Sequence, residues 1–210
     1  MVRVRRITGG TDNCYLVTNG KKAILVDTAS GPYLDKVTEA CDKYEMQLIV
    51  LTHVHFDHAE NAAELSRRYD IPVAIHPLDE ELFDSFDYQP LKPSGAVGRV
   101  VLGLSKKPLT QTKVERPEKL IYIQDGDDLS SYGIPAKVIG LPGHTKGSIG
   151  LDVAEKYLLV GDELDNWLVP GIGHLYHDPE TLRASAEKVR DLGDRIICYG
   201  HGKPTKNGKF

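Results

Sequence analysis

Residues 50–61, V-L-T-H-V-H-F-D-H-A-E-N, place three histidines and one aspartate within six positions. The apolar residues 48–51 predict a buried strand, because they form an unbroken run that includes β-branched side chains. Residues 59–69 carry apolar side chains at helical spacing, so the polar cluster lies where a strand gives way to a helix. Its members are His53, His55, Asp57 and His58, and each can bind a metal ion.

This cluster cannot be packed into a protein core without partners. An unpaired buried polar group costs roughly a few kcal/mol, and a bound metal ion would satisfy all four side chains together. The alternative is a histidine-rich loop in solvent. We favour a metal site, because the cluster follows directly on a buried strand.

Length, charge and cysteine content set limits on the class of protein. A chain of 210 residues fits one well-filled domain, and a net charge of −4 with both signs spread along it predicts no nucleic-acid or membrane partner. The basic N-terminus continues into Thr11-Asp12-Asn13 and is no secretory signal. Three distant cysteines argue against a disulfide framework and for the cytoplasm: Cys14, Cys41 and Cys198.

The first fifty residues alternate strand and turn patterns. Three apolar segments predict an antiparallel meander, at residues 2–7, 14–18 and 23–27. Asn19-Gly20, between the last two, is typical of a two-residue hairpin in which both turn positions take positive φ. A helix over residues 32–44 and a strand over 47–51 then lead to the histidine cluster.

The remaining chain continues this alternation around one irregular segment. Strands are predicted at residues 71–75, 120–123, 136–140, 148–153, 157–160 and 195–199, and helices at 79–86 and 179–192. Residues 87–118 hold four prolines, with one helix at 95–104, and we interpret them as an insertion serving as a lid or a dimer contact. The pattern predicts a single α/β domain over residues 1–210, with helices outside two packed sheets.

Further metal ligands are expected at the ends of other strands, where loops present functional side chains. Three segments fit this description. His144 lies in L-P-G-H-T, Asp162 ends L-L-V-G-D, and His201 follows the apolar residues 196–199. The same arrangement, a strand whose end carries a ligand, therefore occurs four times.

Taken together, these motifs resemble those of the metallo-β-lactamase-fold hydrolases, including their glyoxalase II-like and lactonase-like branches. The matching runs are T-H-V-H-F-D-H, P-G-H-T, G-D and G-H, in that order. The resemblance implies a four-layer αββα sandwich with metals at one edge of the two sheets. It also implies that His53, His55 and His144 bind one metal, that Asp57, His58 and His201 bind a second, and that Asp162 bridges them.

The chemistry of this donor set agrees with the resemblance. Imidazoles and carboxylates without a cysteine suit two Zn²⁺ ions, with iron or manganese as alternatives. Water held between two such ions can be a hydroxide near neutral pH. We expect this metal-bound hydroxide to attack a small ester, thioester or lactone, with Asp57 orienting the water or relaying its proton.

Several further residues have two interpretations each. Asp27 matches the family's D-T-G position, with Ala29 in place of the glycine, and would accept a hydrogen bond from a ligand imidazole or cap a helix. Trp167, His174 and Tyr176 would bind substrate or lie in a solvated loop. Thr145 and Lys146 would contact substrate or complete a turn, whereas His76 and Cys198 are expected to be structural.

Branches of the superfamily can be compared motif by motif. The resemblance to true β-lactamases fails at Asp162, which they lack, and that to the acyl-homoserine lactonases fails at Asp165, where they carry tyrosine. The chain ends nine residues after His201, so the helical domain with which hydroxyacylglutathione hydrolases hold glutathione is not expected. Glu60-Asn61 replaces the glycine-rich turn of the tRNA-processing branch.

Two other functions remain open on sequence alone. Persulfide dioxygenases share these motifs but bind a single non-haem iron, which here would use His53, His144 and Asp162. A metal-bound scaffold or sensor with incidental turnover is the third reading. The sequence favours the binuclear hydrolase.

Overall fold

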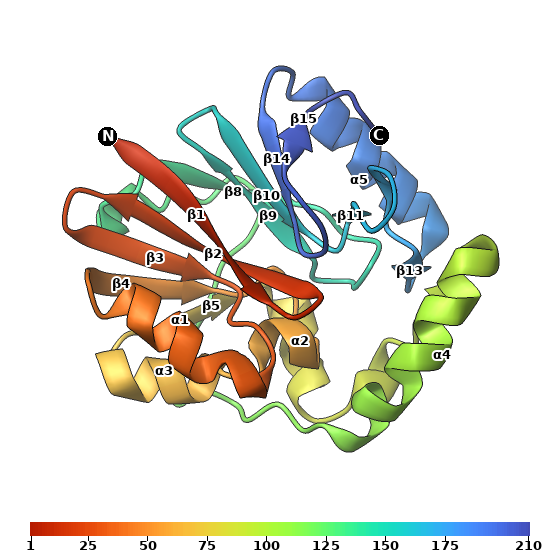
Figure 1. The fold of residues 1–210 in the computed structure, drawn as a ribbon, viewed down its shortest axis with the longest axis horizontal. Helices are drawn as coiled ribbons and strands as arrows, with labels where there is room; N and C mark the ends of the chain where they lie inside the picture. The colour runs from red at the N-terminus through yellow and green to blue at the C-terminus, as the bar shows by residue number, and fades with distance from the viewer.

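The protein was analysed as a computed structural model that describes residues 1–210. Two sheets face each other (Figure 1). The six-stranded sheet has the order β1 (Val2–Gly9), β2 (Asp12–Asn19), β3 (Lys22–Val26), β4 (Glu45–Val50), β5 (Val73–Ile75) and β7 (Leu120–Tyr122). The five-stranded sheet has the order β15 (Thr205–Lys206), β14 (Ile196–Tyr199), β10 (Tyr157–Gly161), β9 (Ile149–Val153) and β8 (Ala136–Gly140).

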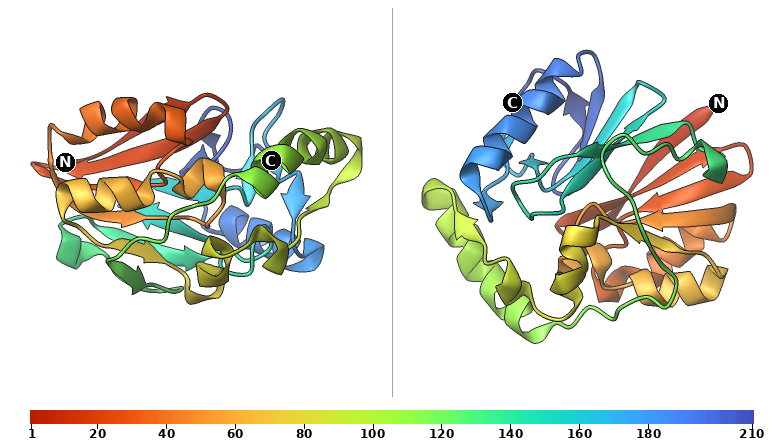
Figure 2. Two further views of the ribbon diagram at one scale, coloured as in Figure 1. Left: turned by 90° about the horizontal axis from the view of Figure 1, so that it is seen from below. Right: turned by 180° about the vertical axis from the view of Figure 1, so that it is seen from behind.

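Helices cover the outer face of each sheet, as the edge-on view in Figure 2 shows. Helices α1 (Leu34–Cys41) and α3 (Ala62–Tyr69) cover the first sheet, and α5 (Pro179–Asp191) covers the second. Three buried apolar clusters separate these four layers, and the one between the sheets includes Val50 and Leu151. The predicted αββα sandwich is therefore confirmed.

The predicted antiparallel meander is confirmed, but its second turn differs by one residue. Asn19 pairs with Lys22, so the two turn residues are Gly20 and Lys21 rather than Asn19 and Gly20. Gly20 alone has positive φ, at 64°. A turn with glycine at its first central position follows the twist of the strands equally well. After this hairpin the sheet continues with parallel pairings from β3 to β7.

Two predicted helices are interrupted. The helix expected over residues 59–69 is split into α2 (Phe56–Ala59) and α3, because Asn61 donates from Nδ2 to the carbonyls of Thr28, Ala29 and Ser30. The helix expected over residues 79–86 is formed by two 3₁₀ segments, Pro77–Phe83 and Phe86–Tyr88. Both interruptions lie next to the histidine cluster, where local hydrogen bonds compete with helix formation.

Residues 87–118 contain one long helix, α4 (Gly95–Gln111), which lies apart from the helices that cover the sheets (Figure 2). It is longer than predicted and continues through Pro108, although proline cannot donate to the carbonyl of Leu104. Gly98 is its only buried residue. Four two-residue strands complete the fold and pair as β6 (Lys92–Pro93) with β13 (Leu175–Tyr176), and β11 (Leu164–Asp165) with β12 (Gly171–Ile172). None of the helices combines the length and apolarity needed to cross a bilayer.

Candidate metal centre

All seven predicted ligands meet at one edge of the sandwich. They come from the loop and short helix after β4, from the turn after β8, and from the ends of β10 and β14. Their ligand atoms form three groups within which every distance is at most 4.8 Å: His53, His55 and His144; His53, His58 and Asp162; and Asp57, His58 and His201. The first and third groups contain the residues predicted for the two metals, and the second group, which includes Asp162, lies between them.

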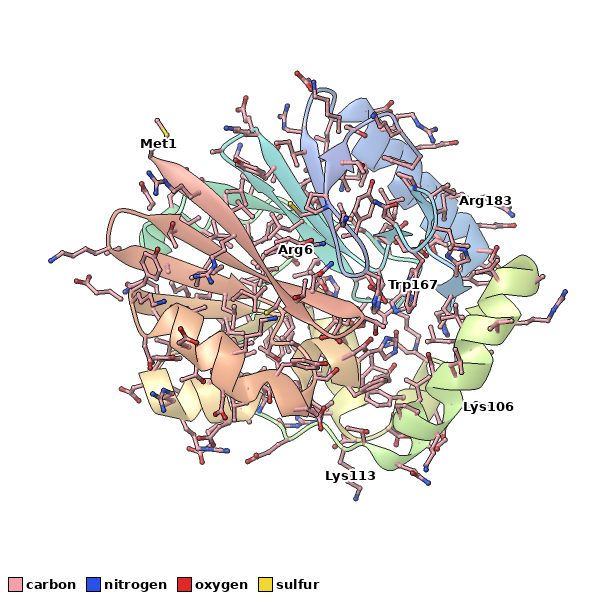
Figure 3. The ribbon with its side chains drawn as sticks, viewed as in Figure 1. Met1, Arg6, Lys106, Lys113, Trp167 and Arg183 are labelled. Atoms are coloured by element: carbon pink, nitrogen blue, oxygen red, sulfur yellow. The ribbon has the colours of Figure 1, made fainter.

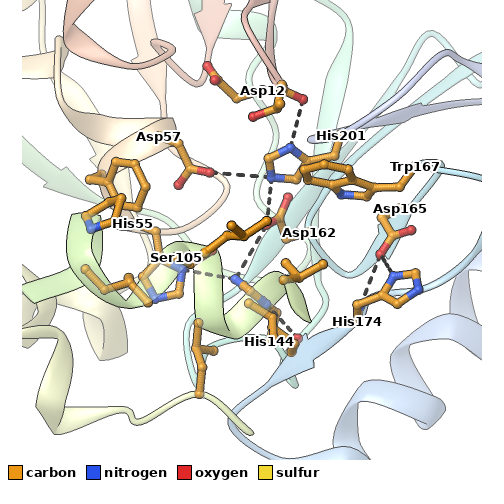
Figure 4. Close-up of a pocket in the computed structure, with 18 of the residues that line it drawn as sticks. Asp12, His55, Asp57, Ser105, His144, Asp162, Asp165, Trp167, His174 and His201 are labelled. Carbon is orange, nitrogen blue, oxygen red and sulfur yellow. Dashed lines mark hydrogen bonds and ion pairs between the residues drawn. The ribbon is translucent and has the colours of Figure 1, made fainter. Parts of the chain in front are cut away.

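Asp162 occupies the position expected of a bridging ligand. Its Oδ1 lies 3.3 Å from His58 Nε2, and its Oδ2 lies 3.3 Å from His201 Nε2 and 3.7 Å from His144 Nε2. Asp57 Oδ2 lies 3.5 Å from His201 Nε2. Figure 4 shows Asp57, Asp162, His144 and His201 directed towards a common centre.

The hydrogen bonds of the imidazoles identify the ring nitrogen that is available to a metal ion. The Nδ1 atoms of His144 and His201 lie 2.8 Å and 2.9 Å from the backbone carbonyls of Leu175 and Thr11. A carbonyl only accepts hydrogen bonds, so each Nδ1 carries a proton, and Nε2 is the nitrogen directed to the cluster that would bind a metal ion. His58 is arranged in the same way, because its Nδ1 lies 2.9 Å from the carboxylate of Asp27.

His53 is oriented through a hydroxyl group. Thr52 Oγ1 donates to the carboxylate of Asp27, and His53 Nδ1 lies 3.2 Å from that same oxygen. The hydroxyl has only one proton, so it accepts from His53 Nδ1, and Nε2 of His53 faces the cluster as a lone pair.

The cluster contains buried polar atoms that have no partner in the protein. These are Nε2 of His53, of His55 and of His58, together with Oδ1 of Asp162. Although His58 Nε2 lies 3.3 Å from Asp162 Oδ1, the two atoms form no hydrogen bond. Divalent cations would satisfy these atoms, and imidazoles with carboxylates are a suitable donor set for zinc, iron or manganese. The residues present therefore fit a metal centre.

The first group of ligands consists of neutral imidazoles. Burial lowers the pKa of His53, His55 and His144, to about 3 for His55, and the neighbouring imidazoles lower the pKa of His53 and His55 further. Neutral histidine is the form that binds metal. This group is thus ready to bind a cation at neutral pH.

The second group carries concentrated negative charge. Burial alone lowers the pKa of His58 and His201, but the carboxylates of Asp162 and Asp57, joined at His58 by that of Asp27, together outweigh it and hold both pKa values well above the usual range. Burial conversely raises the pKa of Asp162, and the two imidazoles return it to well below its usual range. Without a cation the group therefore retains protons, which a metal ion would displace.

Asp27 orients two of the ligands, His58 directly and His53 through Thr52. Its carboxylate accepts hydrogen bonds from His58 Nδ1 and from the backbone N–H and hydroxyl of Thr52. The alternative of a helix cap does not apply, because the residue at the N-cap of the following 3₁₀ helix is Ser30. Ala29, in place of the family's glycine, has a φ of 59° and is buried, so the left-handed conformation is retained at a cost of roughly 1–2 kcal/mol.

Asp79 is a supporting residue that sequence analysis missed. It is fully buried, and it accepts hydrogen bonds from the hydroxyl of Thr145 at 2.7 Å and from the N–H of Gly147 at 2.8 Å. Burial raises the pKa of Asp79 to about 6. Thr145 therefore completes the turn that carries His144 and does not face the cavity, and no sequence motif marks Asp79 for this role.

The loop that carries His201 is fastened by the N-terminal strands, which sequence analysis also missed. Arg6 Nη1 and Asn13 Nδ2 both donate to the carbonyl of Gly202 at 2.8 Å. The Tyr15 hydroxyl donates to the carbonyl of Tyr199 at 2.7 Å. These bonds join the two sheets beside the ligand.

A cavity of about 370 Å³ opens above the ligands (Figure 4). Trp167 and His174 line it, as predicted for substrate-binding residues. The ring centroids of Trp167 and His201 are 5.1 Å apart, and His174 Nδ1 is hydrogen-bonded to the buried Asp165. Tyr176, the third residue predicted to bind substrate, does not line this cavity, and its hydroxyl lies 3.5 Å from the carbonyl of Pro93.

The remaining residues in question are structural. Lys146 donates from its backbone to Gln89 and from Nζ to Glu81, so it stabilises the His144 turn from outside. His76 caps a 3₁₀ helix by accepting from the N–H of Leu78. Cys198 is buried, and burial raises the pKa of its thiol to about 12, so it is unreactive.

Known proteins resemble this chain in sequence. The model of the metallo-beta-lactamase superfamily matches residues 7–201. An uncharacterised protein of Mycobacterium leprae is 30% identical over 209 residues, covering 93% of this chain and 88% of that protein. A hydroxyacylglutathione hydrolase of Yersinia pestis is 31% identical over 199 residues, covering 93% of this chain but only 63% of that enzyme.

Two solved structures share the fold over nearly their whole length. TTHA1623 in a di-iron-bound form has a TM-score of 0.69 and 25% identity, covering 99% of this chain and 96% of that one. The B3 metallo-beta-lactamase BLEG-1 has a TM-score of 0.71 and 24% identity, covering 99% and 95%. The second similarity concerns the fold alone.

Proposed function

The chain belongs to the metallo-beta-lactamase superfamily, and from that premise we propose that it is a binuclear metal-dependent hydrolase of a small ester, thioester or lactone. The proposal rests on one observation above all. Two groups of imidazole and carboxylate ligand atoms adjoin the single carboxylate of Asp162, and buried atoms in both are left without protein partners. A two-ion site accounts for all of them.

The seven proposed ligands would form two metal sites. His53, His55 and His144 would hold one ion, Asp57, His58 and His201 the other, and Asp162 both. Bound there, divalent cations supply Lewis acidity towards a carbonyl oxygen and lower the pKa of coordinated water from about 15.7 towards about 7. The di-iron form of TTHA1623 and the donor set here leave zinc, iron and manganese as candidates.

We propose that Asp57 accepts and transfers the proton of the attacking water. It lines the cavity beside His201, and burial raises its pKa while the neighbouring imidazoles of His58 and His201 outweigh burial and lower it. A carboxylate that stays ionised can accept a hydrogen bond from the attacking water and hold its orientation. It can then pass the proton to the departing alcohol or thiol.

The competing proposal is an oxidoreductase of the persulfide dioxygenase type, with one iron held by His53, His144 and Asp162. Such a site would leave Asp57, His58 and His201 without a metal, although their ligand atoms also lie within 4.8 Å of one another. The two proposals therefore differ in metal content, and a second ion bound at this group would support the binuclear hydrolase.

Metal analysis combined with one substitution tests the proposal. Metal-free protein titrated with Zn²⁺ should bind two ions per chain and release protons, because His58 and His201 must deprotonate to bind metal. Asp162→Asn removes the negative charge that both ions would share. We expect the transition state to lose roughly 4 kcal/mol or more of stabilisation, so kcat/KM for ester or thioester hydrolysis should fall at least about 10³-fold.

Three other results would contradict this function. One iron per chain with oxygen consumption would establish the dioxygenase. Uniformly slow turnover of esters, thioesters and lactones by protein that holds two metals would indicate a scaffold. An Asp162→Asn variant that retains both ions and full activity would remove the bridging carboxylate from the mechanism.

A further inference from the structure

The cavity has two sides of opposite chemical character. Its floor consists of the imidazoles and carboxylates of the metal centre. One side is apolar and comes from α4, through Val101, Leu104, Pro108 and Leu109. The cavity therefore joins a reactive floor to a hydrocarbon wall.

The position of α4 is set by one close contact. Gly98 packs so tightly that an added Cβ would lie 2.5 Å from the carbonyl of His174, and Ser94 donates to that same carbonyl at 2.8 Å. Beyond this contact the helix is largely uncovered, and Leu104 is 75% exposed although it lines the cavity. The wall thus offers apolar area that no other part of the protein covers.

A second apolar segment adjoins the cavity at Trp167. Trp167 lines the cavity, and the next two residues, Leu168 and Val169, are 80% and 70% exposed. Figure 3 shows Trp167 on the side of α4 towards the sandwich and Lys106 on the outer side of the helix. The cationic side chain of Lys106 is therefore directed away from the cavity.

Away from the metal centre, the cavity has no cationic side chain of lysine or arginine. Four aspartates line it: Asp12, Asp57, Asp162 and Asp165. Two divalent cations at the floor would more than offset the charges of Asp57 and Asp162, but no lysine or arginine lining the cavity could pair with an anionic group distant from the metals. A carrier with carboxylates at its far end, such as glutathione, finds no matching charge.

From these observations we propose that the substrate is a neutral acyl compound whose unbranched hydrocarbon chain lies along α4 while its carbonyl group reaches the metal centre. This inference rests on the proposed hydrolase function and specifies its substrate class. The volume of about 370 Å³ lies at the lower end of small-molecule sites, which span about 300–1,000 Å³, so a chain of medium length fits.

A hydrocarbon chain suits this surface better than a second copy of the protein. The apolar residues form the wall of a concave cavity that continues to the ligands, so a protein partner seated there would close the path to the metal centre. A narrow chain covers Val101, Leu104 and Trp167 and leaves the carbonyl group at the floor.

Binding can be measured without turnover, because Trp167 is the only tryptophan in the chain and lines the cavity. Methyl ketones cannot be hydrolysed and reproduce an acyl group with its chain. Titration with 2-butanone, 2-hexanone and 2-octanone should shift Trp167 emission to shorter wavelength. Affinity should rise with length by up to about fourfold per methylene, the equivalent of about 0.8 kcal/mol.

Two lysine substitutions and a neighbouring control test the wall. Val101→Lys or Leu104→Lys should weaken 2-octanone binding about tenfold, as expected when an apolar contact is lost. Either variant should also bind 7-oxooctanoate more tightly than 2-octanone, whereas the original protein shows the opposite order. Val100→Lys is the matched control, because Val100 is 63% exposed on the same helix and does not line the cavity, and it should change neither affinity more than twofold.

Hydrolysis should follow the same order. For neutral N-acetylcysteamine thioesters, kcat/KM should rise from acetyl through butanoyl and hexanoyl to octanoyl, and Val101→Lys should lower the octanoyl-to-acetyl ratio about tenfold. A hydroxyacylglutathione should react more slowly than the octanoyl thioester.

The possible failures are distinguishable. Ketone affinity that does not depend on length, tighter binding of 7-oxooctanoate by the original protein, or a dimer in which Trp167 no longer responds to ketones would each overturn the inference. Length-dependent ketone binding with no thioester turnover would instead overturn the hydrolase and leave an apolar binding site. Rapid turnover with no chain-length dependence would uphold the hydrolase and reject the acyl-chain wall.

Discussion

The floor and the α4 wall of the cavity are built by different means. At the floor, the ligands His53, His58 and His144 are at most 2% exposed, and each has Nδ1 fixed by a hydrogen bond. On the wall, α4 buries only Gly98, Leu104 is 75% exposed, and Val101, Pro108 and Leu109 are half-buried. Several hydrogen bonds fix the ligands of the floor, whereas the close contact of Gly98 with His174 positions the wall.

This difference assigns the chemical step to the floor and the choice of substrate to the wall. Rigid strand ends hold catalytic geometry within narrow limits, and a loosely attached helix can change its side chains without disturbing them. Substitutions behind the floor should therefore alter stability and metal binding, whereas substitutions beneath the wall should alter the choice of substrate. Three measurements examine this division, in order of decreasing expected effect.

The largest effect concerns the pH dependence of stability at Asp79. Its pKa is about 6 in the folded state against 3.8 for an ordinary aspartate, so the folded state binds the proton more tightly. The resulting stabilisation is complete below pH 3.8 and is lost as the pH rises through 6, and a difference of 2.2 units amounts to roughly 3 kcal/mol. Relative to Asp79→Asn, which cannot titrate, the free energy of unfolding should fall by about that amount between pH 4 and 7.

Chemical denaturation of both proteins across this pH range gives the difference directly, because every other titrating group is common to them. Asparagine can accept from the N–H of Gly147, and the hydroxyl of Thr145 can reverse to accept from its amide. The variant should therefore fold. A difference that stays constant or grows with pH would show that the turn of His144 does not depend on a protonated Asp79.

The second effect concerns the imidazole of His58, which Asp27 orients. In Asp27→Asn, an amide N–H placed opposite His58 Nδ1 would favour the wrong tautomer, with Nε2 protonated and unable to bind metal. We expect a loss of about 10- to 100-fold in affinity for the second metal ion, as found for other residues that support metal ligands. Asn tolerates the left-handed conformation at this position, where φ is 58°, so the backbone should be unaffected.

Competition with a chromophoric chelator measures this affinity for each ion. Asp128→Asn provides the matched substitution at an exposed turn, where the side chain accepts only from Ser130, and should leave both affinities unchanged. If Asp27→Asn weakens the two ions equally, its effect arises from general unfolding of the floor rather than from the tautomer of His58.

The floor was predictable from sequence because its signals are local. Each ligand directly follows a short apolar strand, and a strand end is recognisable from a few neighbouring residues, as with Val160-Gly161-Asp162. The supports of the floor were not predictable, because they depend on contacts across the chain. Asp79 meets Gly147 from 68 positions away, and Arg6 meets Gly202 from 196.

The wall was harder to predict for a different reason. Pro108 suggested an irregular end, but the helix continues past it because an exposed helix loses one hydrogen bond there without burying an unpaired carbonyl. Alternation along a two-residue strand decides which neighbour faces the cavity, and Leu175 lines it whereas Tyr176 does not. The register of so short a strand is set by its partner, Lys92–Pro93, which the sequence does not reveal.

The smallest effect tests whether one glycine positions the wall. Gly98→Ala and Gly103→Ala make the same change on α4, and each should favour the helix by about 1 kcal/mol. Only the first creates a contact, 2.5 Å from the carbonyl of His174, whereas a Cβ on Gly103 meets nothing within 4 Å. We expect Gly98→Ala to move α4 away from the floor and to lower the affinity for 2-octanone about threefold to fivefold, with both metal ions still bound.

The pair of variants separates helix stability from helix position. Gly103→Ala strengthens the same helix without moving it, so its affinity for 2-octanone should stay within twofold of the original. Equal losses in both variants would mean that flexibility of α4, rather than its place beside His174, determines how the chain is bound. No loss in Gly98→Ala would mean that the apolar wall does not depend on this contact, and the contrast between a floor fixed by several hydrogen bonds and a wall fixed at one point would no longer hold.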